Sequence, residues 1–170
     1  MQAASHIEIR RAGPDDAPAI AHVLYRSFVE FKALYTEGGF TATTPGAEQI
    51  LGRMREGPVW LARAAGIVLG TVAAVATGDL VYIRGMAVLP SARGSGTGAA
   101  LLQHVEDWAA GQRCVRLSLS TTPFLSSAIR LYERSGFRRT GEGPHDLFGT
   151  PLFMMQKSIS LAPTQVRTPT

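Results

Sequence analysis

Three glycines at alternate positions could form a binding site in this sequence. Gly94, Gly96 and Gly98 lie within VLPSARGSGTGAALL (Val88 to Leu102), between strand-forming and helix-forming residues. Glycine in a helix is about 1 kcal/mol less favourable than alanine, so three glycines so close together suggest another purpose. A glycine-rich turn before a helix is a typical phosphate site, because the first helical amides have no internal partners. The alternative is a tight turn in which the glycines only permit close packing.

The identity of the phosphate ligand can be narrowed from the residues around the turn. GSGTGA (94–99) satisfies the dinucleotide pattern GxGxxA, but the acidic residue expected about twenty positions later is absent, since Ser118 to Ser120 stand there. The ATP-type phosphate loop requires a lysine after its last glycine, and Gly98 is followed by alanine. Both nucleotide interpretations are therefore disfavoured.

The N-terminal third of the chain is expected to supply one strand and two helices. His6–Arg10 alternates like a short strand, and apolar residues then recur every three or four positions as far as Phe31, which predicts a helix with Asp15 as its cap. Gly38 and its neighbour Gly39 should break this helix. After a loop, Thr44-Pro45 is expected to begin a short helix that ends near Gly57.

The rest of the chain is expected to form a sheet with two further helices. Three strands separated by glycine turns predict an antiparallel meander, and a strand on either side of the glycine-rich helix predicts a parallel pair. The expected strands are 59–64, 67–78, 79–90, 115–120, 137–143 and 151–159, and the expected helices are 99–112 and 125–135, the second ended by Gly136.

Two segments resemble the signatures of the GNAT superfamily of acyl-CoA-dependent N-acyltransferases. Arg93 to Gly98 resembles that family's R/Q-x-x-G-x-G/A pyrophosphate loop, and AIRLYERSGF (Ala128 to Phe137) resembles its helix with a tyrosine and a closing Gly-Phe. The resemblance covers about Ile7 to Ile159. It implies an α/β (α+β) GNAT fold, with a mixed, mostly antiparallel sheet of about seven strands and about four helices. A single domain over 1–160 and a flexible tail over 161–170 are expected.

The resemblance implies that acetyl-CoA is the acyl donor. In this family the pantetheine arm bonds to the exposed edge of the fourth strand, which matches Met86 to Val88, and the Val88 amide would face the thioester oxygen as an oxyanion donor. The backbone amides of the glycine turn would receive the pyrophosphate. The residues thus assigned to the cofactor are Met86, Ala87, Val88, Arg93, Gly94, Ser95, Gly96, Thr97, Gly98, Ala99 and Ser127.

Tyr132 matches the family tyrosine that supports the sulfur and often acts as a general acid, so Tyr132 and Val88 are the predicted catalytic residues. The helical face on which Tyr132 lies is apolar, so the alternative is that Tyr132 is a core residue. The chain also departs from the family pattern. Leu125 replaces a cofactor-binding asparagine, for which Ser126 or Ser127 would have to substitute.

The general base is not identified by the sequence. The glutamate that many family members carry on or near the fourth strand has no counterpart between Val81 and Val88, where Arg84 is the only charge. The remaining candidates, each also explained as a solvated surface group, are Asp79, Glu30, Glu37, His145 and Asp146.

The expected reaction is direct transfer of acetyl to a primary amine in a ternary complex. A small metabolite, an antibiotic and a protein amine are all compatible acceptors, and a non-catalytic acyl-CoA sensor is the alternative function. The segments FKALYTEGGFTATTP (31–45) and EGPHDLFGTP (142–151) should form the acceptor pocket. The aromatic candidates for its lining are Phe31, Tyr35, Phe40 and Phe148.

Composition narrows the remaining partners. The 170 residues are 45% hydrophobic and carry a net charge of +4, which suits an anionic ligand, but no nucleic-acid-binding module is recognisable. No apolar run approaches the ~20 residues of a membrane span, and no signal-peptide core or metal-ligand spacing occurs. Cys114 is the only cysteine, which points to the cytoplasm. Whether the chain forms a homodimer is left open.

Overall fold

Seven strands form one mixed sheet in the order β1-β2-β3-β4-β5-β9-β6 in the computed structural model, which describes residues 6–143 and 145–161. The strands of this sheet are β1 (Glu8–Arg11), β2 (Val59–Ala64), β3 (Ile67–Thr77), β4 (Leu80–Val88), β5 (Arg116–Thr121), β6 (Arg138–Arg139) and β9 (Phe153–Ser158). The α-helices are α1 (Ala17–Phe28), α2 (Glu37–Thr43), α3 (Ala47–Glu56), α4 (Thr97–Gly111) and α5 (Ser126–Arg134). The mixed sheet and the β2-β3-β4 meander are confirmed.

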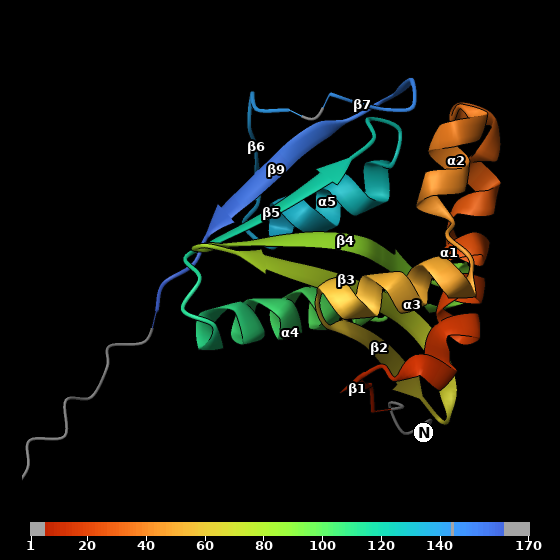
Figure 1. Cartoon of the computed structure of the whole chain (residues 1–170), viewed down its shortest axis with the longest axis horizontal. Coiled ribbons are helices and arrows are strands. Elements are labelled where there is room, and N and C mark those ends of the chain that lie inside the picture. The colour runs from red at the N-terminus through yellow and green to blue at the C-terminus, as the bar shows by residue number, and fades with distance from the viewer. Residues whose placement is uncertain (1–5, 144, 162–170) are drawn as a thin grey trace, which may run out of the picture.

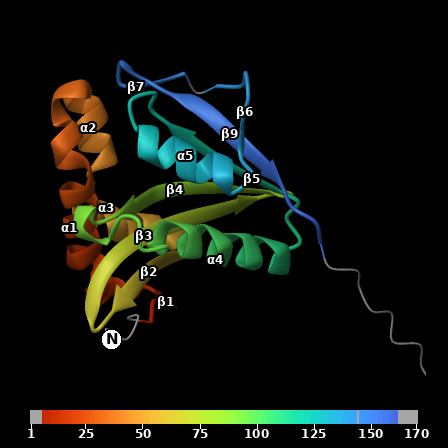
Figure 2. The ribbon, with the colours of Figure 1, turned by 180° about the vertical axis from the view of Figure 1, so that it is seen from behind.

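Helices cover both faces of the sheet because successive side chains of its central strands point to opposite sides. Trp60 and Val72 are buried on the face covered by α4 and α5, whereas their neighbours Val59 and Ala73 are buried on the face covered by α1 and α3. Figures 1 and 2 show these two helical layers from opposite sides. The resulting pair of apolar cores holds the central strands between them.

Strands β4 and β5 form the parallel pair expected around the glycine turn, but they pair over only part of their length. The pairing runs from Leu80↔Arg116 to Ile83↔Leu119 and then ends, and the strands diverge toward the right in Figure 1. A bulge follows at once, because the register with β3 shifts between Thr71 and Ala73, and Gly85 there has a φ of +57°. Since a bulge bends its strand, we attribute the fork between β4 and β5 to it.

Replacing Gly85 with alanine should lower the free energy of unfolding by about 1–2 kcal/mol, because a left-handed φ disfavours any side chain. The new Cβ would also lie 2.9 Å from Nη1 of Arg53. Gly52→Ala is the control: Gly52 lies within α3 with nothing near its missing Cβ, so alanine should stabilise the protein by about 0.5–1 kcal/mol. Urea denaturation measures both, and an unchanged Gly85→Ala variant would contradict the left-handed backbone at Gly85.

The expected break at Gly38-Gly39 is wrong, because this segment forms α2. The Thr36 hydroxyl caps α2 by accepting from the Gly39 amide at 3.0 Å. A Cβ on Gly39 would lie 2.2 Å from Oγ1 of Thr150, so this glycine serves close packing against a small hairpin. That hairpin, β7 (Asp146–Leu147) and β8 (Thr150–Pro151), lies in a segment expected to be a loop.

Other boundaries differ by a few residues. The first helix ends at Phe28 and continues as 3-10 turns over Val29–Leu34, and the third starts at Ala47 rather than at Pro45. Helix α4 begins at Thr97, two residues earlier than expected. The expected flexible tail falls, from Ala162 on, outside the described residues.

Candidate active site

The glycine turn gives α4 an open N-terminus. Gly94 and Gly96 both have left-handed backbones, with φ of +77° and +86°, and Gly96 is the residue that caps α4. Nothing lies within 4 Å of the Cβ that either glycine would carry. The space beside these two residues is therefore free, and the free amides and dipole of a helix N-terminus favour an anion there.

Gly98 is a glycine for a different reason. Its missing Cβ would lie 2.7 Å from Cδ2 of Leu131 on α5 and 3.5 Å from Cε of Met86 on β4. Of the two interpretations of the glycine turn, a phosphate site and close packing, close packing therefore accounts for Gly98. Gly94 and Gly96 provide the open turn, and Gly98 lets α4 pack closely against α5.

Side chains around the turn hold it in place. The Ser95 hydroxyl donates to the Ala92 carbonyl and lies 2.9 Å from Oγ1 of the buried Thr97. The Arg93 guanidinium points away from the turn, to the Ser27 carbonyl at 3.0 Å and to the carboxylate of Glu30. The Arg93 amide donates to the Pro90 carbonyl at 3.4 Å, so its N–H is already engaged.

The far end of β4 presents a backbone edge to the fork. The Leu89 amide donates to the Leu69 carbonyl at 2.8 Å, which makes these two a hydrogen-bonded pair. In an antiparallel ladder the next pair, Val88 and Gly70, then turns its amides away from each other. The Val88 amide consequently faces the side on which β5 has diverged, where the Val88 carbonyl accepts from Oγ of Ser27 at 3.1 Å.

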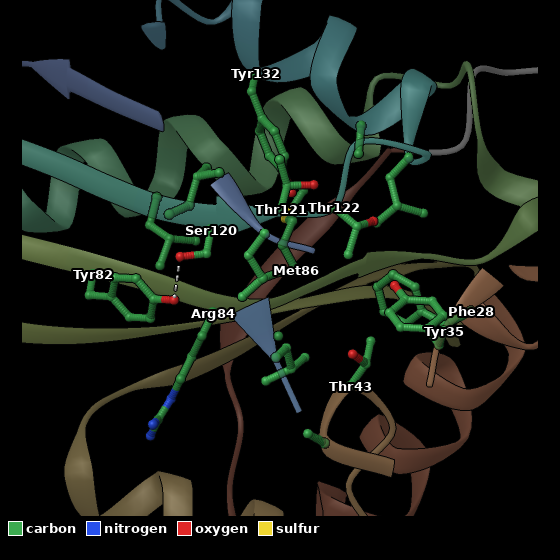
Figure 3. A pocket seen from close by; sticks show the side chains of 18 of the residues that line it. Phe28, Tyr35, Thr43, Tyr82, Arg84, Met86, Ser120, Thr121, Thr122 and Tyr132 are labelled. Atoms are coloured by element: carbon green, nitrogen blue, oxygen red, sulfur yellow. Dashed lines mark hydrogen bonds between the residues drawn. The ribbon is translucent and has the colours of Figure 1, made fainter. Parts of the chain in front are cut away.

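A cavity of about 270 Å³ opens in the fork (Figure 3). Tyr132 reaches into it from α5 toward Met86, and Tyr35 and Thr43 border another side. Among the described residues that line it, the charged ones are Arg53 and Arg84 only. Its described lining residues are Phe28, Tyr35, Ala42, Thr43, Arg53, Tyr82, Ile83, Arg84, Gly85, Met86, Leu119, Ser120, Thr121, Thr122, Leu125, Ala128, Tyr132, Leu147 and Leu152.

Tyr132 combines packing with access to this cavity. Its side chain is buried, and its ring packs edge-on against Phe137 with centroids 6.0 Å apart. Burial raises the pKa of the Tyr132 hydroxyl above its usual range, and the nearby Tyr35 adds to the shift. The hydroxyl therefore stays protonated at ordinary pH and can donate a proton inside the cavity.

Three of the candidate bases are engaged by other groups. Asp79 pairs with Arg116 at 3.0 Å, at the end where β4 and β5 are still paired, and Glu30 pairs with Arg93. The Asp146 carboxylate accepts from the Gly149 amide at 2.6 Å within the hairpin. None of the five candidates lines the 270 Å³ cavity.

Ser127 also lies outside this cavity. It is exposed on α5 and accepts from Nη2 of Arg130 at 3.2 Å, whereas Ala128 of the same helix and Leu125, the residue before the helix, line the cavity.

A second hollow, of about 660 Å³, adjoins the 270 Å³ cavity and shares Ala42 and Arg53 with it. The 270 Å³ space is the inner cavity, and the 660 Å³ space is the outer hollow. Glu37 and Phe148 line it, together with other residues of the segment 37–49. Of the aromatic candidates, Tyr35 therefore lines the inner cavity and Phe148 the outer hollow. Phe31 instead packs against Phe124, and Phe40 is buried beside Tyr25 and Tyr35.

The sequence interpretation missed Arg53 and the Tyr82–Ser120 pair, whose hydroxyls lie 3.2 Å apart at the cavity edge (Figure 3). The alternation of side chains along β4 could have pointed to Tyr82, whereas no pattern in the sequence around Arg53 on α3 marked that residue.

The described residues contain no group of three or more His, Cys, Asp or Glu suited to a metal ion. None of the helices in 6–143 and 145–161 is long and apolar enough to cross a bilayer.

Comparisons with known proteins agree on one family. Residues 22–137 match the acetyltransferase (GNAT) family. The uncharacterized N-acetyltransferase YjgM of Escherichia coli (strain K12) is 32% identical over 136 residues, which cover 76% of this chain and 80% of that protein. The probable N-acetyltransferase family 8 member 5 of Mus musculus is 34% identical over 92 residues, which cover 51% of this chain but only 40% of the mouse protein.

Solved structures agree on the fold. The PaiA N-acetyltransferase of Thermoplasma acidophilum, solved in complex with coenzyme A, has a TM-score of 0.77 at 17% identity over 91% of this chain and 99% of that chain. Ard1 of Thermoplasma volcanium has a TM-score of 0.74 at 22% identity over 91% and 98% of the two chains.

Proposed function

Because the chain belongs to the GNAT family of acetyltransferases, we propose that it transfers acetyl from acetyl-CoA directly to a primary amine while both substrates are bound. Acetyl-CoA is the acyl donor of the family. The observation that carries the proposal is the fork between β4 and β5, where the Val88 amide faces the side from which β5 has diverged and Tyr132 lines the cavity. A donor to the thioester oxygen and an acid for the sulfur are two of the groups that this reaction needs.

The proposed acetyl-CoA site runs from the glycine turn to the fork. The backbone amides from Gly94 to Ala99 would hold the pyrophosphate, supported by the open space at Gly94 and Gly96. Arg93 would anchor the turn through Ser27 and Glu30 rather than donate its own amide. The edge of β4 from Met86 to Val88 would hold the pantetheine arm. Ser127 would reach only an exposed part of the cofactor, since it lies on the outer side of α5.

Two residues would carry the chemistry. The Val88 amide would stabilise the negative charge that develops on the thioester oxygen as the amine nitrogen attacks. Tyr132 would donate its proton to the departing thiolate, as coenzyme A leaves and the amide forms. The proton lost by the amine would pass to solvent, since none of the described carboxylates lines the cavity.

A thiol-release assay with a panel of primary amines tests the proposal. Release of coenzyme A should depend on an amine, and mass spectrometry should find that amine acetylated. Acetyl-CoA binding without acetylation of any amine would contradict the proposal and favour the acyl-CoA sensor.

A cytoplasmic location belongs to the same proposal, supported by the single, buried cysteine, and cell fractionation would test it.

Cys114 should not interfere with that assay. The residue is 1% exposed, and burial raises the pKa of its thiol, which keeps it in the unreactive protonated form. Native protein should therefore react with a disulfide reagent far more slowly than urea-unfolded protein. Equal rates, measured by absorbance before and after denaturant is added, would contradict the burial of this thiol.

A further inference from the structure

Two arginines that lie close enough for their charges to interact line the inner cavity, and acetyl transfer by itself does not account for them. Arg53 comes from α3 and Arg84 from β4, and both line the cavity. Arg53 also lines the outer hollow, so it stands where the two spaces meet. Arg53 and Arg84 together form the arginine pair.

No described carboxylate pairs directly with Arg53, although the charge of Glu56, which pairs with Arg84, partly offsets that of Arg84. Arg53 is partly buried and forms no salt bridge with any described residue. Its polar contact with the protein is a long one, from Nη2 to the Ala42 carbonyl at 3.5 Å. Burial lowers the pKa of Arg53, and the positive charge of Arg84 adds to this effect. A guanidinium held in this way is stabilised when a negative group comes beside it.

Arg84 is only partly neutralised. Its Nη2 lies 2.8 Å from a carboxylate oxygen of Glu56, whose side chain is 56% exposed and thus well solvated. Its Nε is buried without a hydrogen-bond partner among the described residues. Buried polar groups in proteins are almost always paired, so this N–H is available to a ligand or a water molecule.

The rest of the inner cavity is neutral. Its other polar side chains are hydroxyls, including those of Tyr82, Ser120 and Thr43, and no described carboxylate lines it. An ammonium group is repelled by the arginine pair, whereas a carboxylate or phosphonate can accept two parallel bonds from a guanidinium. The amine end of an acceptor would consequently point away from the pair, toward Tyr132.

Resting on the acetyl transfer proposed above, we propose that the acceptor is a small amine that also carries an anionic group, which the arginine pair binds. The anionic group is a carboxylate, a phosphonate or a phosphate ester. The inner cavity, at about 270 Å³, lies at the small end of ligand sites and suits a metabolite rather than a folded protein surface.

Matched amines test this proposal. Amino acids such as β-alanine and 4-aminobutyrate are compared with their amides, and 2-aminoethylphosphonate and O-phosphoethanolamine with ethanolamine. The specificity constant, kcat/KM for the amine, should be at least tenfold higher for the anionic member of each productive pair. The carboxylate, phosphonate and phosphate arms then show which anion is preferred.

Variants connect that preference to the arginine pair. Arg53→Gln should lower kcat/KM for the anionic amine at least tenfold, mainly through KM, and change that for its neutral partner less than threefold. Arg84→Gln should act in the same direction. Arg55→Gln is the control, because Arg55 is exposed on the same helix and lines neither hollow, so the preference should persist.

The outcomes separate this inference from the proposed function. Equal or better acetylation of neutral amines, or equal losses on both partners in Arg53→Gln, would overturn the anionic acceptor and leave acetyl transfer standing. Absence of acetylation for every amine, with acetyl-CoA bound, would overturn the proposed function and this inference with it.

Discussion

Replacing Tyr132 with phenylalanine is expected to lower the turnover number about a hundredfold while acetyl-CoA binds as before. The variant keeps the ring that packs against Phe137 and removes only the hydroxyl in the cavity. A proton donor to the leaving thiolate acts mainly in the transition state, so its loss should affect kcat rather than binding. If Tyr132 only packs, stability would change by about 1 kcal/mol and turnover would hold.

Steady-state rates with the best amine, together with calorimetry of acetyl-CoA binding, measure this effect. Tyr25→Phe is the control, because Tyr25 is exposed on α1 and does not line the cavity, and its turnover should match the parent. Turnover of Tyr132→Phe within threefold of the parent, with chemistry shown to be rate-limiting, would return Tyr132 to a packing role.

The raised pKa of Tyr132 adds a condition on pH. An acid must be protonated to act, and burial moves the pKa of this hydroxyl upward from its usual value near 10. The parent rate should therefore show no loss attributable to Tyr132 below about pH 10. An alkaline fall well below that pH, present in the parent and absent in Tyr132→Phe, would contradict the burial argument.

Replacing Gly96 with aspartate should weaken acetyl-CoA binding at least thirtyfold relative to Gly96→Asn, which corresponds to about 2 kcal/mol. Asparagine and aspartate both tolerate the left-handed backbone that Gly96 adopts, so the two variants differ mainly in charge. The difference reports a negative charge placed beside the pyrophosphate at the N-terminus of α4.

Calorimetry of both variants at low and high salt measures this difference. It should shrink as salt is added, because salt screens exposed charges. Circular dichroism serves as the folding control. Equal affinities in two folded variants would place the pyrophosphate elsewhere.

Local patterns predicted the elements that frame the site. Alternation along the meander predicted its strands, and the helical period after the glycine turn and Gly136 predicted α4 and the end of α5. Together these elements led to the mixed sheet. The spacing of the two signatures led to the family. These features depend on residues that are neighbours in sequence, where dihedral preferences and side-chain period act directly.

The features that the sequence did not reveal depend on contacts between distant residues. Gly39 looked like a helix breaker, but it is a helical residue that makes room for Thr150, more than a hundred positions away. Gly98 looked like part of a phosphate path, but it packs against Leu131. Arg53 carried no signal, because it meets Arg84 only when α3 lies across the bulge of β4.

Initial rates measured while acetyl-CoA and the best amine are both varied test the central proposal, direct transfer within the fork. Double-reciprocal lines should intersect, because both substrates must be bound before coenzyme A leaves. Parallel lines, with the acetyl group found on the protein when the amine is withheld, would contradict direct transfer.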